Sequence, residues 1–168
     1  EALLPLTTCR NLWIWGLDEG ETSLYKQDMH PLGFDVHTTL DPEEVASHAN
    51  LIITATPSKK PLLDAAWIKA GTHITAIGSD TPEKHELDSA ILAAADIVVA
   101  DSISQCRLRG EIYHALQAGS LNEEKVRELG HVIDDPALQR QTDDQISIAD
   151  LTGVAVQDIK IAAAVYRQ

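Results

Sequence analysis

The chain has few basic residues. Its 168 residues contain 13 Lys and Arg against 26 Asp and Glu, a formal net charge of -13 at pH 7. This charge repels the phosphate backbone of nucleic acids and the anionic surface of membranes. The composition therefore argues against both nucleic acid and membrane as partners.

Cysteines and long apolar runs are also scarce. Cys9 and Cys106 lie far apart, without the spacing of a disulfide framework or a zinc site, which favours free thiols in a reducing cytoplasm. The seven histidines show no metal-ligand spacing either, so no metal is expected. Apolar stretches such as 90–95 and 159–166 are too short, or too interrupted by charge, to span about 30 Å of hydrocarbon. A cytoplasmic location follows as an expectation.

No internal repeat or Gly/Ser linker divides the chain, and 44% hydrophobic content is enough for one core. Segments with the pattern of strands alternate with helical ones. Three of the strands are apolar on both faces, which is typical of a parallel sheet covered by helices on both sides. The sequence thus predicts a single α/β domain over 1–168 with a doubly wound, mostly parallel sheet. The expected strands are 12–16, 35–39, 51–56, 73–78, 97–100 and 145–149. The expected helices are 21–32, closed by Gly33, then one that starts with Asp41 as N-cap and Pro42 in its first turn, and 88–95, 103–118, 122–129 and 152–166.

Small and polar residues follow several of the expected strands. In a doubly wound sheet, ligands bind at the carboxyl ends of the strands, and small or hydroxyl residues there let a nucleotide approach closely. The carboxylate of Asp18 can accept hydrogen bonds from ribose hydroxyls, and Glu19 and Glu21 beside it repel a 2'-phosphate. NAD is therefore favoured over NADP. The residues expected at this edge include Gly16, Asp18, Thr54, Thr56, Gly78, Ser79 and Asp80.

Each of these residues also has a simpler interpretation. Asp80 directly after a strand can be a turn former or the N-cap of a helix. Asp18, Thr54 and Thr56 can likewise be ordinary residues that close loops. Residue type and position leave these alternatives open.

Several short motifs occur in one order along the chain, and together they resemble the ornithine cyclodeaminase/mu-crystallin family. The resemblance covers almost the full length. The motifs are Thr54-Ala55-Thr56-Pro57-Ser58, Trp67-Ile68-Lys69-Ala70-Gly71-Thr72-His73, Gly78-Ser79-Asp80 with Lys84 and Glu86-Leu87-Asp88, Gly110-Glu111-Ile112, and Asp150-Leu151-Thr152-Gly153.

The resemblance implies an NAD(H)-binding domain. Cyclodeaminases of this family use bound NAD to convert ornithine to proline and ammonia, and other members are imine reductases, so the implied substrate is a small amino acid or a cyclic imine. Asp80 resembles the catalytic aspartate that handles protons beside the nicotinamide. The implied cofactor contacts are Asp18, Thr54, Thr56, the strand end Thr75, Ala76, Ile77 and Gly78, then Ser79 and Thr152.

The family's first strand, its glycine-rich turn and its substrate domain would precede Glu1, and residues 1–5 resemble the end of the helix after that turn. We therefore expect an incomplete domain that is inactive by itself. The alternative is a non-catalytic module that self-associates and no longer binds dinucleotide. An exposed apolar strand edge promotes association, so the sequence predicts either direct pairing of 12–16 with 51–56 or a homo-oligomer.

Overall fold

The computed structural model describes residue 5 and residues 7–167, so most of the helix end expected at 1–5 lies outside the described residues. The chain forms two compact units, Glu1–Ala49 and Asn50–Gln168. The expectation of a single dinucleotide-binding domain over 1–168 stays a prediction.

The first unit is a parallel pair of strands joined by a helix. Asp18 caps this helix by accepting a hydrogen bond from the Glu21 amide at 2.9 Å, and Gly33 ends the helical segment with a φ of 83°. The second helix begins at Pro42 after the N-cap Asp41, as the sequence predicts. The elements are β1 (Asn11–Trp15), α1 (Glu19–Met29), η1 (His30–Leu32), β2 (Asp35–Thr39) and α2 (Pro42–His48).

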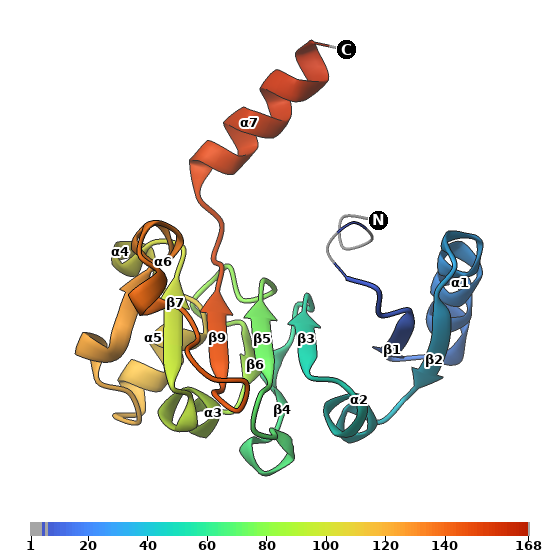
Figure 1. Ribbon diagram of the computed structural model, residues 1–168, viewed down its shortest axis with the longest axis horizontal. Helices are drawn as coiled ribbons and strands as arrows, with labels where there is room; N and C mark the ends of the chain where they lie inside the picture. The colour runs from blue at the N-terminus through green and yellow to red at the C-terminus, as the bar shows by residue number, and fades with distance from the viewer. Residues whose placement is uncertain (1–4, 6, 168) are drawn as a thin grey trace. The chain divides into compact units, whose positions relative to one another are not determined.

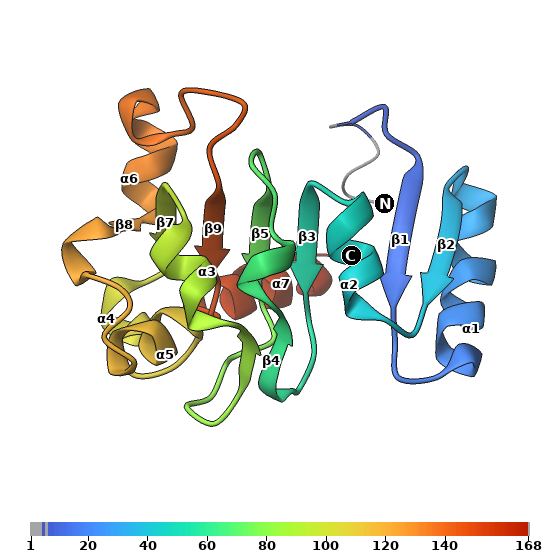
Figure 2. The same ribbon diagram turned by 90° about the horizontal axis from the view of Figure 1, so that it is seen from below.

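The second unit contains a five-stranded parallel sheet in the order β3-β5-β9-β7-β8 (Figures 1 and 2). A small parallel pair, β4 with β6, lies in the connections of this sheet. The elements are β3 (Leu51–Thr54), β4 (Lys59–Leu63), η2 (Ala65–Trp67), β5 (His73–Ala76), β6 (His85–Leu87), α3 (Ser89–Ala94), β7 (Ile97–Ala100), α4 (Ile103–Cys106), α5 (Glu111–Gln117), η3 (Glu123–Lys125), β8 (Val126–Glu128), α6 (Leu129–Asp134), η4 (Pro136–Leu138), β9 (Ser147–Asp150) and α7 (Ala155–Tyr166).

Both faces of this sheet carry helices. The chain moves outward from β7 to β8 through α4 and α5, and returns across β7 to β9 through α6. Because parallel crossovers are right-handed, this reversal puts α6 on the face opposite to α4 and α5. The central strands form the core, with Ile74, Val98 and Ile148 fully buried. The prediction of a doubly wound, mostly parallel α/β sheet is confirmed.

Two of the expected helices differ from the structure. The helix expected at 103–118 is interrupted at Gly110, whose φ of 89° lies outside the helical region, so α4 and α5 are separate. The helix expected at 122–129 is wrong, because 126–128 form the edge strand β8 on β7. The ladder offered by β7, with Val98 opposite Val126, overrides the local helical pattern there.

The two strands expected to pair, at 12–16 and 51–56, each form a ladder with another strand of their own unit. β1 pairs with β2, and β3 pairs with β5 at the end of the five-stranded order. Direct pairing of 12–16 with 51–56 therefore stays a prediction. Among the described residues, no helix has the length and apolar character needed to cross a membrane.

Candidate functional site

The carboxyl ends of β3, β5 and β9 meet at one edge of the sheet in the second unit (Figure 1). The register places Thr54 beside Ala76, and Ala76 beside Asp150. Residues 55–58 and 77–80 leave the strands from this edge. Thr54, Thr56, Gly78, Ser79 and Asp80 are therefore brought together as the sequence predicts. Asp18 belongs to the first unit.

A buried carboxylate ties two of these strand ends together. Glu86, from β6, is 0% exposed and accepts four hydrogen bonds. Thr54 Oγ1 donates to it at 2.7 Å, and Thr56 donates both its amide at 2.6 Å and its hydroxyl at 2.7 Å. The amide of Gly78 completes the set at 3.0 Å. Glu86 thus fixes the segments after β3 and β5 relative to one another.

Position 78 requires glycine, because the neighbouring atoms leave no room for a side chain. A Cβ at this position would lie 2.3 Å from the carbonyl oxygen of Thr56 and 2.5 Å from the carboxyl carbon of Glu86. Both distances are far below van der Waals contact. The glycine therefore serves the close approach of the two strand ends.

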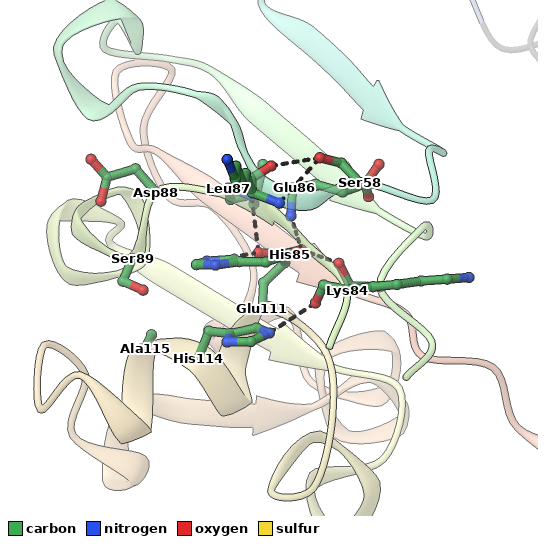
Figure 3. Close-up of polar contacts among 12 residues, drawn as sticks. Ser58, Lys84, His85, Glu86, Leu87, Asp88, Ser89, Glu111, His114 and Ala115 are labelled. Atoms are coloured by element: carbon green, nitrogen blue, oxygen red, sulfur yellow. Dashed lines mark hydrogen bonds and ion pairs between the residues drawn. The ribbon is translucent and has the colours of Figure 1, made fainter. Parts of the chain in front are cut away.

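A second buried carboxylate, Glu111, holds the segment that follows β5. Glu111 is the first residue of α5 and is 0% exposed. Its carboxylate accepts a hydrogen bond from the Ser79 hydroxyl. It also accepts from the Glu86 amide at 2.8 Å and from the Leu87 amide at 3.0 Å (Figure 3). Burial raises the pKa of the Glu111 carboxyl above its ordinary value.

Two stacked imidazole rings lie beside this carboxylate (Figure 3). His85 and His114 have ring centroids 4.0 Å apart and an interplanar angle of 12°. His114 donates from Nε2 to the Lys84 carbonyl oxygen at 2.8 Å. His85 Nε2 lies 3.7 Å from Glu111 Oε2. Burial lowers the pKa of His85, and the adjacent His114 lowers it further.

Asp80 lies on the exposed side of this segment. Its side chain is 54% exposed, and Lys84 Nζ donates to Asp80 Oδ1 at 2.5 Å. This hydrogen bond lowers the pKa of the Asp80 carboxyl. Asp80 is therefore an ionised, accessible carboxylate at neutral pH.

We expect Lys84→Met to raise the pKa of Asp80 toward the ordinary value of an aspartate. The hydrogen bond from Lys84 is the main cause of the lowered pKa. A lowered pKa in the folded state means that the pair contributes to stability above the ordinary pKa, and loses this contribution as the pH falls through the lowered one. Carboxyl NMR titration of Asp80 measures the change. Lys60→Met, on β4, is the control and should leave the titration unaltered.

The remaining predicted cofactor contacts lie at or near the same edge. Ile77 is 45% exposed, whereas Ala76 and Thr152 are buried. Thr152 donates from its hydroxyl to Asp101 Oδ1 at 3.3 Å, and Thr75 Oγ1 lies 3.1 Å from His73 Nε2. The assignment of cofactor roles to these residues stays a prediction. In the described part of the chain, no group of three or more His, Cys, Asp or Glu is arranged to hold a metal ion.

Sequence reasoning placed Glu86 and Glu111 in motifs but gave neither a role. Both are fully buried, and both bond to groups 24 to 32 residues away in the chain. No local pattern distinguishes them from the other acidic residues of this chain. The signal that identifies them is tertiary.

A model of the ornithine cyclodeaminase/mu-crystallin family matches residues 1–168. The chain belongs to this family. An uncharacterized cyclodeaminase of Sinorhizobium fredii is 39% identical over 99% of this chain and 51% of its own length. The alanine dehydrogenase of Archaeoglobus fulgidus is 42% identical over 78% of this chain and 41% of its own length. The chain thus spans about half the length of the curated relatives it matches.

Solved structures of family members have the same fold. An archaeal alanine dehydrogenase dimer with bound NAD superposes with a TM-score of 0.89 and 34% identity, over 99% of this chain and 51% of that one. The iminosuccinate reductase of Paracoccus denitrificans in complex with NAD+ gives a TM-score of 0.80 and 30% identity, over 96% of this chain and 57% of that one. This member of the ornithine cyclodeaminase/mu-crystallin family therefore has a Rossmann-like α/β fold.

Proposed function

We propose that this chain is the NAD(H)-binding part of an ornithine cyclodeaminase or of a related imine or amino-acid oxidoreductase. The observation that carries the proposal is the exposed Asp80–Lys84 pair, held at the carboxyl edge of a parallel sheet. Solved relatives with the same fold bind NAD. The substrate class is a small amino acid or a cyclic imine. We infer that the 168 residues bind the dinucleotide without turning over substrate, because catalysis requires further groups that orient the substrate.

We propose that a dinucleotide binds at this edge, where the directions of the hydrogen bonds leave particular atoms as acceptors. The hydroxyl protons of Thr54 and Thr56 are donated to Glu86, and Thr56 Oγ1 also accepts from the Ser58 amide at 3.2 Å. Each hydroxyl oxygen would therefore offer a ribose hydroxyl only a remaining acceptor lone pair. The exposed side chain of Ile77 offers an apolar surface for the nicotinamide ring. Thr75, Ala76, Gly78, Ser79 and Thr152 complete the proposed contacts. The bound dinucleotide would supply the hydride acceptor and donor.

Asp80 is the proposed proton acceptor. Its carboxylate is ionised at neutral pH, and the ammonium of Lys84 at 2.5 Å stabilises the negative charge. An amine proton of the substrate can move to this carboxylate when the two groups lie within hydrogen-bond distance. For Asp18, we propose that the carboxylate accepts hydrogen bonds from the adenosine ribose. Glu19 and Glu21 would disfavour a 2'-phosphate, so NAD is preferred over NADP.

A calorimetric titration of the chain with NAD, NADH and NADP tests the proposal, with tryptophan fluorescence as a second signal. We expect micromolar binding of NAD and NADH, and weaker binding of NADP. Ile77→Asp should weaken NADH binding about tenfold or more, since it replaces the apolar surface beside the neutral dihydronicotinamide ring by a hydrated carboxylate. Ile133→Asp on α6 is the matched control, because Ile133 is also exposed, at 67%, and it should bind as the original chain does.

One observation favours a different function. The donors of Thr54, Thr56 and Gly78 are all taken by Glu86, as they would be in a module that keeps the scaffold without the cofactor. Such a module would act by self-association. A folded chain that ignores all three dinucleotides, yet sediments as a homo-oligomer, would support this alternative and contradict the proposal above.

A further inference from the structure

Helix α5 presents two side chains to the segment that carries Asp80. Glu111 and His114 are three positions apart, and so lie on one face of the helix. Together they make four hydrogen bonds to residues 79–87, and Figure 3 draws the residues of those to 84–87. Glu111 accepts from the Ser79 hydroxyl and from the amides of Glu86 and Leu87, and His114 donates to the Lys84 carbonyl.

In the sequence, these four contacts lie before, at and after the Asp80–Lys84 pair. Ser79 directly precedes Asp80, and the Glu86 amide comes two residues after Lys84. The carbonyl of Lys84 itself is held by His114 at 2.8 Å. The ion pair needs the backbone at 80 and at 84 to keep a fixed separation. A single helix face therefore fixes the segment before, within and after the pair.

Stability alone does not explain a carboxylate at position 111. Removing a charged group from water is costly, and well-packed apolar residues commonly replace buried charges without loss of stability. A carboxylate, however, offers two acceptor oxygens in one rigid plane. Here these oxygens collect three donors from the two ends of one turn, which an apolar side chain cannot do. Glu86 does not hold this turn in the same way, because its donors come from the ends of two strands, β3 and β5.

We propose that Glu111 and His114 are positioning residues that hold Asp80 and Lys84 in the geometry needed for proton transfer. Neither residue is assigned contact with the substrate. The catalytic meaning of this inference rests on the proposed function. The structural claim, that α5 sets the geometry of the pair, is tested without cofactor or substrate.

The first test is Glu111→Gln in the 168-residue chain. Glutamine keeps the volume but replaces one acceptor oxygen by an NH2 group, so the turn loses an anchor. We expect Asp80 to titrate at a higher pH than in the original chain, because its pairing with Lys84 loosens. We also expect the amides of Glu86 and Leu87 to exchange about tenfold faster or more, while the amides of Val98 and Ile148 keep their rates.

A control separates positioning from general destabilisation. Glu128, on β8, also accepts a hydrogen bond from a backbone amide, that of Ile103 at 2.7 Å. Glu128→Gln should lower stability without changing the titration of Asp80. A purely structural role for Glu111 would instead speed exchange throughout the core and leave Asp80 as it was.

A second variant keeps the test decisive if Glu111→Gln does not fold. His114→Phe retains a ring that can stack on His85, but lacks the donor for the Lys84 carbonyl. We expect the same upward shift in the titration of Asp80. An unchanged titration in every folded variant at 111 and 114 would overturn the inference. A shifted titration in a chain that fails to bind NAD would support the inference and contradict only the proposed function.

Discussion

We expect Glu86→Ala to lower the free energy of unfolding by about 3–5 kcal/mol. The substitution removes the common acceptor of Thr54, Thr56 and Gly78, and leaves the buried donor of Thr54 and the part-buried donors of Thr56 and Gly78 without a partner. Each unsatisfied buried donor costs about 1–3 kcal/mol. The missing side-chain atoms of Glu86 leave a cavity that adds to the loss.

Urea unfolding followed by circular dichroism measures this effect. Glu83→Ala is the matched control, because Glu83 lies three residues earlier and is exposed. The control should change stability by less than about 0.5 kcal/mol. A loss below about 1 kcal/mol for Glu86→Ala would show that water or a rearranged backbone satisfies the three donor residues. It would contradict the role of Glu86 as the link between the ends of β3 and β5.

Gly78→Ala should destabilise the chain by about 2–3 kcal/mol. The added methyl group would meet the carbonyl oxygen of Thr56 at 2.3 Å, and the backbone there cannot move aside as a flexible side chain can. The segment would have to shift away from β3, which weakens the hydrogen bond from the Gly78 amide to Glu86. We therefore also expect weaker binding of NAD by this variant.

Gly130→Ala provides the comparison for the same chemical change. Gly130 lies in α6, and nothing within 4 Å would meet an added Cβ. Alanine also favours helix over glycine, so stability should stay the same or rise by up to about 1 kcal/mol. Thermal unfolding of both variants checks the contrast. Equal unfolding midpoints for the two variants would refute the claim that the close approach of the strand ends requires glycine at position 78.

Family membership does not fix the reaction of this chain. The names of its relatives include a cyclodeaminase, an alanine dehydrogenase and an iminosuccinate reductase, and each is similar to this chain over most of this chain's length. The predictions for the Asp80–Lys84 pair do not depend on which of these reactions the chain serves, because they are measured without substrate.

Local sequence determined much of the fold. Asp41 followed by Pro42 starts α2, Gly33 ends the segment after α1, and the apolar runs at 51–56, 73–78 and 97–100 all contain strands of the parallel sheet. These features follow from backbone dihedral preferences and side-chain burial, which depend on few neighbouring residues. The order of short motifs also sufficed to identify the family.

The tertiary structure decided the strand β8, where the helix expected at 122–129 is replaced by a ladder with β7. It also decided the roles of Glu86 and Glu111. Their hydrogen-bond partners lie up to 32 residues away, and only the folded sheet brings them within 3 Å. The sequence by itself determined which edge of the sheet carries Asp80. The fold determined which buried carboxylates hold that edge in place, because a buried charge takes its role from partners that are distant in the chain.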